Sequence, residues 1–445
     1  MMEEFVSNFT SFDSIIIPVF TDTRTHPMAT PLSLLYVRFS DFEYILPFNH
    51  NEVIPLSLDH LRKLHTTRCV FTPVAKALRV LLPNCQNIID LNGMEYFTTG
   101  SVTADHTFYL PFQRSFYNRY RTHPELNHAL PISVLSQYLR NYADALECIR
   151  SNQKSLLTDS AFIFHNNVVI PACQFIESSG IHVDIDQFLD KYGADSSHLV
   201  TNSLVYTDHN PYTTTGRITS KFGGVNFGAL NKSDGTRRMY TSRFDRGMMV
   251  MIDFESFHLR LMSDLMEYPL PSGSLHEYFG RQYFNVESLT PEEYAESKQI
   301  TFALLYGDQT ETDIPFFSRV RSFVSALWAH SVESGALTSP TGRILPLERI
   351  EESSPAKLFN YMLQLREMEV SMQGIFNLQS AMVGKQSRVV LYNYDSILID
   401  FALDDGRDLL VDIMEILSQN GKFPVRLFSG NTYHDLKDKT TLIKL

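Results

Sequence analysis

Two aspartates stand at positions in the sequence where a carboxylate could hold a divalent cation. Asp253 directly follows the apolar run MMVMI, and Asp395 lies between the apolar runs RVVLY and ILIDF. Carboxylates on neighbouring strand ends suit a two-metal phosphoryl-transfer site, in which ions about 3.5–4 Å apart activate the attacking oxygen and stabilise the leaving one. Each aspartate alone is weak evidence, because aspartates at strand ends and in turns usually serve as capping or turn residues.

A cationic and aromatic stripe lies between the two aspartates. Lys298, Phe302 and Tyr306 are spaced by four residues, so a helix would project all three from one face. The lysine could then hold a triphosphate, and the rings could stack on a base or a sugar. The simpler interpretation is an amphipathic core helix with one exposed lysine, and the spacing alone favours that interpretation.

The segments that carry these residues have the patterns needed to position them. Residues 248–253 predict a strand that delivers Asp253 at its C-terminal end and continues into a helical pattern, SFHLRLMSDLM. Residues 388–401 predict a β-hairpin with Asp395 at its tip. Residues 291–306 predict a helix that begins at a proline and ends before a glycine.

The rest of the chain reads as a mixed α/β protein. Its first 150 residues alternate short apolar runs, such as SIIIPVF, with helical patterns, such as PVAKALRVLL. Residues 155–191 are helical in pattern, and a polar, irregular stretch to about residue 210 precedes the segment PYTTTGRITSKFGGVNFG. We therefore expect a multidomain protein of the α/β and α+β classes.

Composition indicates a globular protein of two or three domains. The chain has 445 residues, of which 44% are hydrophobic, so it can bury a sizeable core. Its acidic start lacks the basic residues and apolar run of a secretion signal, and no apolar stretch approaches the roughly 20 residues of a membrane span. We expect a cytosolic protein. Four widely spaced cysteines without a Cys-x-x-Cys pair indicate neither a zinc site nor a disulfide scaffold.

The net charge of −12 argues mildly against nucleic-acid binding, but charge is distributed unevenly along the chain. Between residues 216 and 247, basic side chains far outnumber acidic ones: Arg217, Lys221, Lys232, Arg237, Arg238, Arg243 and Arg246 against Asp234 and Asp245. Such a stretch fits a polyanion-binding surface, although many runs of this kind are only solvated faces.

Several segments resemble, in order, the motifs of family A DNA polymerases, the group of DNA polymerase I. MIDFESFHLR resembles the first palm motif, D-Y-S-Q-I-E-L-R, and KQITFALLYG the finger-helix motif, K-x-x-x-F-x-x-x-Y-G. YNYDS stands where the family has Q-V-H-D-E. Upstream, TTTGRITS is similar to the T-G-R-L-S-S segment and TRRMYTSRF to the arginine-bearing stretch before the first palm motif. PTGRILPL and Gln373-Gly374 resemble the G-R-R-R-Y-L-P element and the Q-G pair, so the likeness extends from about residue 212 to the C-terminus.

The resemblance implies a role for each matching residue. It makes Asp253 and Asp395 catalytic carboxylates that bind two Mg²⁺ ions, which Mn²⁺ could replace, with the main-chain carbonyl of Phe254 as a further ligand. Lys298 would contact the triphosphate of the incoming nucleotide. Further residues at or near this nucleotide would be Phe302, Tyr306, His258 and Tyr294.

The resemblance also implies contacts with primer and template. The residues concerned are polar or basic and come from the matching segments: Arg217, Arg238, Arg260, Gln373 and Arg343. Surface salt bridging is the alternative for Arg217, Gln373 and Arg343.

Three departures from the family motifs lie around the two aspartates. The finger helix of the family carries an arginine four residues before the lysine, where this chain has Tyr294. The third carboxylate of the last palm motif is replaced by Ser396, although Glu255 could partly compensate. The glutamate that blocks the ribose 2′-hydroxyl is replaced by His258. We expect discrimination against ribonucleotides to persist but to weaken, unless His258 simply fills the same space.

The resemblance predicts three regions along the chain. Residues 1–150 would form an RNase H-like, degenerate 3′–5′ exonuclease domain, residues 151–210 a reduced thumb or connector, and residues 211–445 the palm and fingers, with fingers at about 265–345. Only about 30 residues separate the segment VIPACQFIESSGIHVD from the T-G-R motif, too few for a long helical hairpin at 1.5 Å rise per residue. We therefore expect low processivity unless a partner clamps the DNA.

The N-terminal resemblance to a proofreading exonuclease is faint. Asp22 remains from the first acidic pair of that domain, but Arg24 stands in place of the second carboxylate. The second motif has no acidic residue, and Asp144 could represent the last motif but has Arg140 where a tyrosine belongs. So few carboxylates cannot hold two metals, so we expect no proofreading.

These observations predict a DNA-directed DNA polymerase that extends a primer with deoxynucleoside triphosphates. One alternative is a single-subunit RNA polymerase-like enzyme, because Asp395-Ser396 also resembles the H-D-S of that group, although Phe302 and SFHLR fit DNA polymerases better. The other is a catalytically silent DNA-binding protein with a polymerase fold. The small size suggests a virus or mobile element, hence location in a host cytoplasm and a replisome partner.

Overall fold

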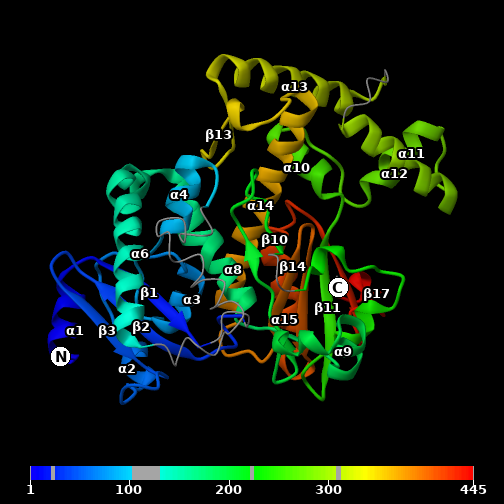
Figure 1. Ribbon diagram of the computed structural model, residues 1–445. Coiled ribbons are helices and arrows are strands. Elements are labelled where there is room, and N and C mark those ends of the chain that lie inside the picture. The colour runs from blue at the N-terminus through cyan, green and yellow to red at the C-terminus, as the bar shows by residue number, and fades with distance from the viewer. Residues whose placement is uncertain (1, 22–25, 103–130, 221–224, 307–311, 444–445) are drawn as a thin grey trace. The chain divides into compact units, whose positions relative to one another are not determined.

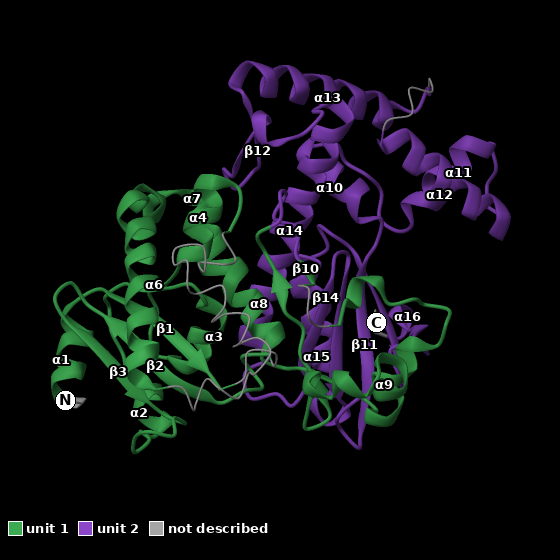
Figure 2. Cartoon of the chain, viewed as in Figure 1, with its two compact units in different colours: residues 1–212, 219–241 green, residues 213–218, 242–445 purple. Residues whose placement is uncertain are grey.

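The computed structural model describes residues 2–21, 26–102, 131–220, 225–306 and 312–443. The chain divides into two compact units (Figure 1, Figure 2), which we call unit 1 and unit 2. Unit 1 consists of Met1–Tyr212 and Thr219–Thr241, and unit 2 of Thr213–Ile218 and Ser242–Leu445. The expected multidomain protein of mixed helices and strands is confirmed.

The sheet of unit 1 has five strands in the order β3-β2-β1-β4-β5. Its antiparallel part consists of β1 (Ser14–Phe20), β2 (Leu32–Arg38) and β3 (Glu43–Pro47), and its parallel part adds β4 (Val70–Thr72) and β5 (Ile88–Asp90) to β1. Alternate residues of β1 enter different buried clusters, Ile16 on one face and Ile17 on the other. Because both faces are covered, β1 and β2 are apolar at almost every position.

Helices contribute to both buried clusters of unit 1. Side chains of α1 (Met2–Ser11) and α3 (Ala75–Leu81) join the cluster of Ile16, and those of α4 (Leu91–Thr99) and α6 (Ile132–Asn152) join the cluster of Ile17. The remaining helices are α2 (Leu58–Arg62), α7 (Ser160–Phe164), α8 (Ile170–Glu177) and α9 (Ile185–Tyr192), with short strands β6 (Ile181–His182), β7 (Val200–Thr201), β8 (Leu204–Val205), β9 (His209–Asn210) and β10 (Thr219–Ser220).

The later part of the predicted thumb or connector, after α8, contains only short elements. Residues 178–212 are all described, and the longest helix among them is α9, with eight residues. The Asp184 side chain caps α9 by accepting a hydrogen bond from the main-chain N–H of Gln187, and Gly193 ends the helix with a φ of 86°. This segment therefore contains no long helical hairpin.

The sheet of unit 2 is antiparallel throughout, in the order β14-β15-β11-β16-β17. Its strands are β11 (Gly247–Phe254), β14 (Arg388–Asn393), β15 (Ser396–Ala402), β16 (Val425–Gly430) and β17 (Lys437–Asp438). The first of these in the chain, β11, lies in the middle of the sheet, with β15 on one side and β16 on the other. It pairs Asp253 with Ser396 and with Arg426.

Helices of unit 2 pack beside this sheet and extend beyond it (Figure 1). The long α14 (Pro355–Ala381) contacts α15 (Gly406–Leu417) and α10 (Phe257–Leu265). A second group comprises α11 (Leu275–Phe284), α12 (Pro291–Tyr306) and α13 (Pro315–Ser334), followed by the hairpin of β12 (Ala336–Thr338) and β13 (Ile344–Pro346); the chain ends near α16 (Thr440–Ile443).

Helices α11 and α12 approach each other closely at Gly280. A Cβ atom at this position would lie 2.8 Å from the Cβ of Ser297 and 2.5 Å from a methyl group of Leu289. Only glycine therefore allows this approach, which holds α12 against α11. Among the described helices, none is both long enough and apolar enough for a membrane crossing.

Candidate active site

A cavity of about 470 Å³ in unit 2 collects most of the residues that the sequence singled out. Its walls come from β11, α10, α12, the turn between β14 and β15, and the segment Thr213–Ile218. The predicted site residues that line it are Arg217, Asp253, Phe254, Glu255, His258, Tyr294, Lys298, Phe302, Tyr306 and Asp395. Residues from widely separated parts of the sequence thus line one cavity.

The two aspartates lie on adjoining strands of the central sheet. Asp253 is near the end of β11 and pairs with Ser396, the residue that follows Asp395. The main-chain N–H of Phe254 donates to the carbonyl of Asp395 at 2.9 Å, which fixes the hairpin turn beside the end of β11. Tyr394 adopts a φ of 60° in this two-residue turn, a conformation that tight hairpins require. Two hard oxygen donors are thus brought to one edge of the cavity.

The expected third carboxylate is absent from its usual place, as the sequence indicated. Ser396 is buried, and its hydroxyl donates to the carbonyl of Asn393 at 3.2 Å, so it is engaged inside the turn. Glu255 instead lines the cavity two residues after Asp253. The oxygen-rich donor set of Asp253, Asp395 and Glu255 suits a hard divalent cation such as Mg²⁺.

Helix α12 turns its predicted stripe toward the cavity. Its buried residues are Ser297, Thr301, Leu304 and Leu305, whereas Lys298, Phe302 and Tyr306 line the cavity from a different face. The Phe302 ring is 43% exposed and stacks on Tyr306 with ring centroids 6.1 Å apart. The core-helix interpretation of the stripe is therefore wrong, because the core face of α12 is made by other residues.

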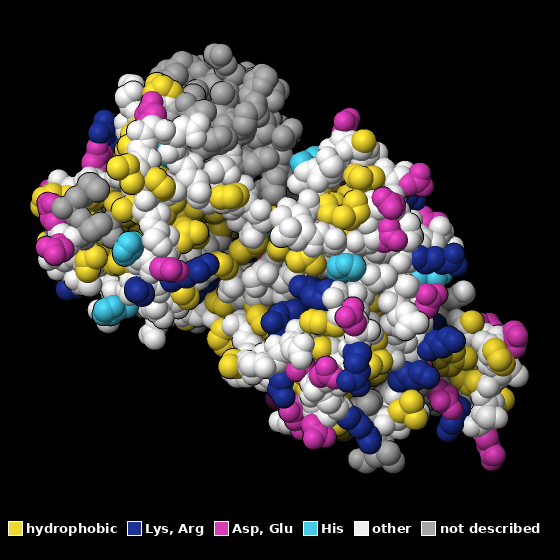
Figure 3. Space-filling model, turned by 90° about the horizontal axis from the view of Figure 1, so that it is seen from below, with side chains coloured by type: hydrophobic (Ala, Val, Ile, Leu, Met, Phe, Trp, Pro, Cys, Tyr) yellow, Lys and Arg dark blue, Asp and Glu magenta, His cyan; other side chains and the backbone are white. Residues whose placement is uncertain are grey.

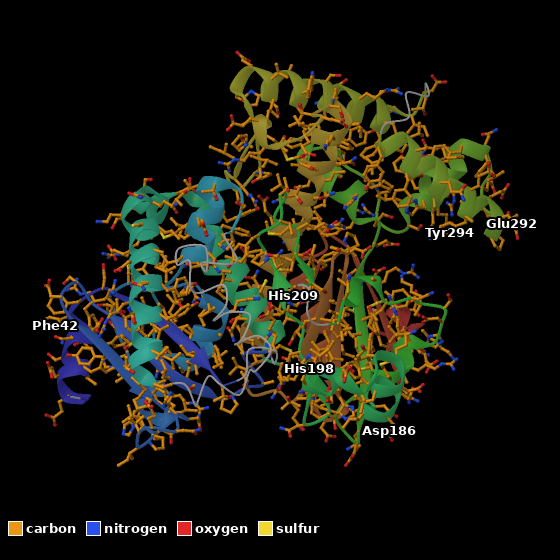
Figure 4. The ribbon with its side chains drawn as sticks, in the orientation of Figure 1. Phe42, Asp186, His198, His209, Glu292 and Tyr294 are labelled. Atoms are coloured by element: carbon orange, nitrogen blue, oxygen red, sulfur yellow. The ribbon has the colours of Figure 1, made fainter. Side chains whose placement is uncertain are left out.

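Tyr294 stands one helical turn before Lys298, where family A polymerases have an arginine. Figure 4 labels it together with Glu292 in the first turns of α12. The Lys298 ammonium lies 4.7 Å from the centroid of the Tyr294 ring, a cation–π contact. The aromatic ring thus supports the lysine and adds no second positive charge.

His258 is held from two sides. One ring nitrogen, Nδ1, is hydrogen-bonded to the hydroxyl of Tyr306, and the other, Nε2, lies 2.5 Å from a carboxylate oxygen of Glu367. Burial, with the nearby charge of Glu367, raises the pKa of the Tyr306 phenol, so this hydroxyl stays protonated. The side chain at the sugar-selecting position of the motif is therefore part of a hydrogen-bonded chain that includes α12 and α14.

Arg217 joins these hydrogen-bonded side chains to the β14–β15 turn that carries Asp395. Its guanidinium donates to both oxygens of Glu367, at 2.9 and 3.2 Å, and lies 3.9 Å from the centroid of the Tyr394 ring. The Glu367 side chain is only 1% exposed, whereas that of Arg217 is 29% exposed. Arg217 thus offers part of its guanidinium to the cavity.

Two of the arginines predicted to contact DNA are buried. Arg260 donates to the carbonyl of Gly273 at 2.9 Å, and Arg343 donates to the carbonyl of Thr214 at 3.3 Å and lies directly over Gly216. Burial lowers the pKa of Arg343 to about 10. The guanidinium groups of Arg260 and Arg343 face protein carbonyls and hold the chain together locally, which speaks against the predicted contacts with DNA.

The other basic and polar candidates differ in exposure. Arg238 is exposed on unit 1, and Gln373 is half-buried on α14, where it donates to Asn377 at 2.9 Å. Within the predicted basic stretch, Arg237 is buried and donates to the carbonyl of Leu230, while Lys221 lies outside the described residues.

Arg243 and Arg246, also in that stretch, form ion pairs with Asp400 and Asp404. Figure 3 shows basic side chains interspersed with acidic ones on the face it displays. Much of the basic stretch is therefore neutralised within the protein.

Charged or titratable residues that line the cavity but were not singled out in the sequence include Glu367, His276 and Arg426. His276 is 7% exposed beside Phe302, and among the described residues its Nδ1 has no hydrogen-bond partner. Burial, assisted by the charge of Lys298, lowers the pKa of His276 to about 4. A neutral imidazole nitrogen thus lies in the wall of the cavity beside the lysine. A lone histidine in a helix gives no sequence signal for this position.

Arg426 extends from β16 directly opposite Asp253 in the sheet register. Its side chain is 40% exposed and forms an ion pair with Asp438 while lining the cavity. Residues opposite one another on adjoining strands point to the same face of a sheet, so this cation stands beside the aspartates. No sequence pattern distinguishes it from an ordinary surface arginine.

The predicted exonuclease residues lie partly on α6. Asp22 and Arg24 lie outside the described residues. Asp144 and Arg140 are on α6, where Asp144 pairs with Arg38 at 2.5 Å and Arg140 pairs with Glu43. Both side chains are thus engaged in ion pairs with residues of the sheet strands β2 and β3.

Unit 1 also contains the one group of three metal-ligand side chains found among the described residues: His26, Glu177 and Asp208. The ammonium of Lys76 lies among them, 2.6 Å from Glu177 and 2.9 Å from Asp208. Burial opposes the charge of Lys76, but the carboxylates of Asp208 and Glu177 overcome this and raise its pKa. The lysine therefore supplies the positive charge that these carboxylates need.

Comparison with known proteins identifies the fold. Neither protein-family models nor curated proteins gave a match. Among solved structures, the polymerase domain of Pol1 from M. smegmatis, determined in complex with DNA primer-template and dNTP, superimposes with a TM-score of 0.70 at 13% sequence identity. The match covers 98% of this chain and 98% of that one. The chain therefore has the fold of a DNA polymerase I polymerase domain, as its resemblance to family A predicted.

Proposed function

We propose that this protein is a template-directed DNA polymerase that adds deoxynucleoside triphosphates to the 3′ end of a primer. The observation that carries the proposal is the cavity of unit 2, which combines Asp253 and Asp395 on adjoining strands with the Lys298 face of α12. The fold supports it, because a solved structure of the same fold holds primer-template and dNTP.

Metal binding would fall to the oxygen donors at the sheet edge. Asp253, Asp395 and the main-chain carbonyl of Phe254 would hold two Mg²⁺ ions, with Glu255 available as a further carboxylate. When bound, such ions activate the attacking oxygen and stabilise the leaving one. The contribution of the protein is to fix the carboxylates at the ends of β11 and the β14–β15 turn, so that little rearrangement is needed.

The incoming nucleotide would lie along the cavity face of α12. Lys298 would contact the triphosphate, and Phe302 and Tyr306 would lie against the sugar and the nascent base pair. His276 and Arg426 would supply polar contacts in place of the arginine that Tyr294 replaces, because both line the same cavity. Exposure of Phe302 and Lys298 supports this arrangement.

Contacts with primer and template would come from fewer residues than the sequence suggested. Arg217, at the cavity, and Gln373 and Arg238, which are not fully buried, remain the proposed DNA-binding residues. Residues 151–210 would form a reduced thumb or connector, and residues 211–445 the palm and fingers. A partner that clamps DNA would then determine processivity.

The N-terminal region would be an exonuclease-like domain without proofreading activity. Its five-stranded sheet, with three antiparallel strands joined by two parallel ones, supports an RNase H-like domain. Engagement of Asp144 by Arg38 supports loss of metal binding there. We further propose a viral or mobile-element enzyme that acts in the cytoplasm.

A primer-extension assay in Mg²⁺ tests the proposed function. A primed DNA template is supplied with deoxynucleotides or with ribonucleotides, and an unprimed template is supplied with ribonucleotides. Extension of the primer that favours deoxynucleotides supports the proposal. Synthesis from the unprimed template would favour the RNA polymerase-like alternative. The observation in favour of this alternative is that His258 replaces the glutamate that blocks the ribose 2′-hydroxyl. Absence of all synthesis, with DNA binding retained, would favour a silent DNA-binding protein.

A further inference from the structure

Glu367 is a buried carboxylate at the back of the candidate active site. It lies on α14, is 1% exposed, and is more than a hundred positions from both of its partners in the cavity. One oxygen accepts a hydrogen bond from Arg217 Nε at 2.9 Å, and the other lies 2.5 Å from His258 Nε2. A carboxylate this deeply buried requires compensating charge and hydrogen bonds, so its contacts with these two residues are constrained.

Only one arrangement of protons satisfies all contacts of a neutral His258 ring. An ionised carboxylate can only accept, so Nε2–H of His258 donates to Glu367. Nδ1 is then the accepting nitrogen, and the hydroxyl of Tyr306 must donate to it. Burial raises the pKa of this phenol, so the proton it needs is present. Glu367 thus fixes both the tautomer and the orientation of the ring.

We propose that Glu367 is the positioning residue for the sugar-selecting side chain, so that discrimination between deoxyribose and ribose depends on the pair of Glu367 and His258. This proposal rests on the polymerase function proposed above. The family A motif has a glutamate where this chain has His258, and here a carboxylate from α14 stands directly behind the histidine. In this chain, an acidic side chain thus lies behind the sugar-selecting position instead of occupying it.

Loss of Glu367 should change the selection between deoxyribose and ribose more than it changes overall activity. With Glu367 in place, the His258 ring is tied to α14 through Nε2 and to α12 through Nδ1, so its position is fixed on both sides. Without Glu367, the ring can rotate or change tautomer and yield space to a 2′-hydroxyl. A merely structural role for Glu367 would instead lower incorporation of both nucleotide types equally.

Single-nucleotide incorporation measures this directly. Values of kcat and KM are determined for a deoxynucleotide and the matching ribonucleotide with the full chain, Glu367→Ala, His258→Ala and the double variant. We expect Glu367→Ala to lower the deoxy-to-ribo ratio of kcat/KM about tenfold, mainly through a lower KM for the ribonucleotide. In the His258→Ala background the same change should leave the ratio unaltered. A ratio within about twofold of the original in Glu367→Ala, or an equal drop in both backgrounds, would overturn the proposal.

Glu369→Ala is the matched control. Glu369 is also buried on α14, but its carboxylate accepts a hydrogen bond from Thr341 and pairs with Arg366. Its loss should lower stability and leave the sugar ratio unchanged; an equal change of ratio would contradict a specific role for Glu367. If Glu367→Ala does not fold, Glu367→Gln decides, since its amide is uncharged and replaces one of the two accepting oxygens with a donating NH2. A ratio at least about threefold lower is expected, and an unchanged ratio overturns the proposal.

The outcomes separate this proposal from the one on which it rests. If the unaltered protein incorporates neither nucleotide, the proposed polymerase function fails and this inference fails with it. If the unaltered protein is active and Glu367→Ala keeps its sugar ratio, only the role of Glu367 is overturned.

Discussion

Lys298 is exposed on the cavity face of α12, with its ammonium supported by the ring of Tyr294. Because Tyr294 stands where the family motif has an arginine, the proposed function makes this lysine carry more of the triphosphate contact than in that motif. We expect Lys298→Ala to lower kcat/KM for deoxynucleotides about 10–100-fold, the loss of a charge-assisted hydrogen bond. Steady-state incorporation checks this, with Lys385→Ala, outside the cavity, as the control. Equal activity of the two variants would contradict the role of Lys298.

His276, on α11, lines the same cavity as a neutral group. Burial lowers its pKa to about 4, so the imidazole is uncharged throughout the range from pH 5.5 to 8. The factor by which His276→Ala raises KM should therefore stay constant across that range. KM measurements for both proteins at several pH values check this. A factor that falls as the pH rises through 6 to 7 would indicate that a protonated His276 binds the nucleotide.

At the scale of elements, the sequence predicted α12 and the β14–β15 hairpin well. Their patterns are local: the four-residue spacing of Lys298, Phe302 and Tyr306 fixes one helix face, and the run ending in Asp395 fixes a turn. The contacts of Glu367 were not predictable, because they join α14 to residues far away in the chain. Burial of Arg343 was missed for the same reason, since a motif gives the residue type but not what packs over it.

Lys76 connects elements of unit 1 and provides a test of stability. It bonds Glu177 at the end of α8 and the carbonyl of His209 in β9. Lys76→Met would leave the Glu177 carboxylate buried without its cation, which we expect to cost about 3–5 kcal/mol of unfolding free energy at pH 7. Thermal or urea unfolding measures this, and Lys63→Met, an exposed lysine of the same unit, is the control. A loss no larger than that of the control would contradict the account.

The same cluster gives unit 1 a predicted acid dependence. Burial alone would raise the pKa of Glu177, but Lys76 and neighbouring histidines lower it well below its usual value of 4.5. Its stabilising contribution is therefore complete above about pH 4.5 and is lost as the pH falls below that value. In Lys76→Met this loss should be smaller, because the cation that depresses the pKa is gone. Unfolding midpoints at pH 7 and pH 4 measure the difference, and an equal loss in both proteins would contradict it.

At the scale of the whole molecule, the fold of a polymerase domain is present although only 13% of residues match its structural neighbour. Residues 178–212, in the proposed reduced thumb or connector, provide only short elements. We expect only a few nucleotides to be added per binding event. Single-turnover extension on a long template, with excess unlabelled DNA as a trap, measures this. Long products in the presence of the trap would show that another part of the chain holds the duplex DNA during extension.

The central claim is that Asp253 and Asp395 form one catalytic pair. Primer extension with Mg²⁺ tests it most directly, comparing the unaltered protein with Asp253→Asn, Asp395→Asn and Asp404→Asn, a control that changes an exposed aspartate of the same unit. We expect extension by the unaltered protein and the control, and a loss of at least about a thousandfold in each of the other two variants. Full activity in either Asp253→Asn or Asp395→Asn would contradict the account.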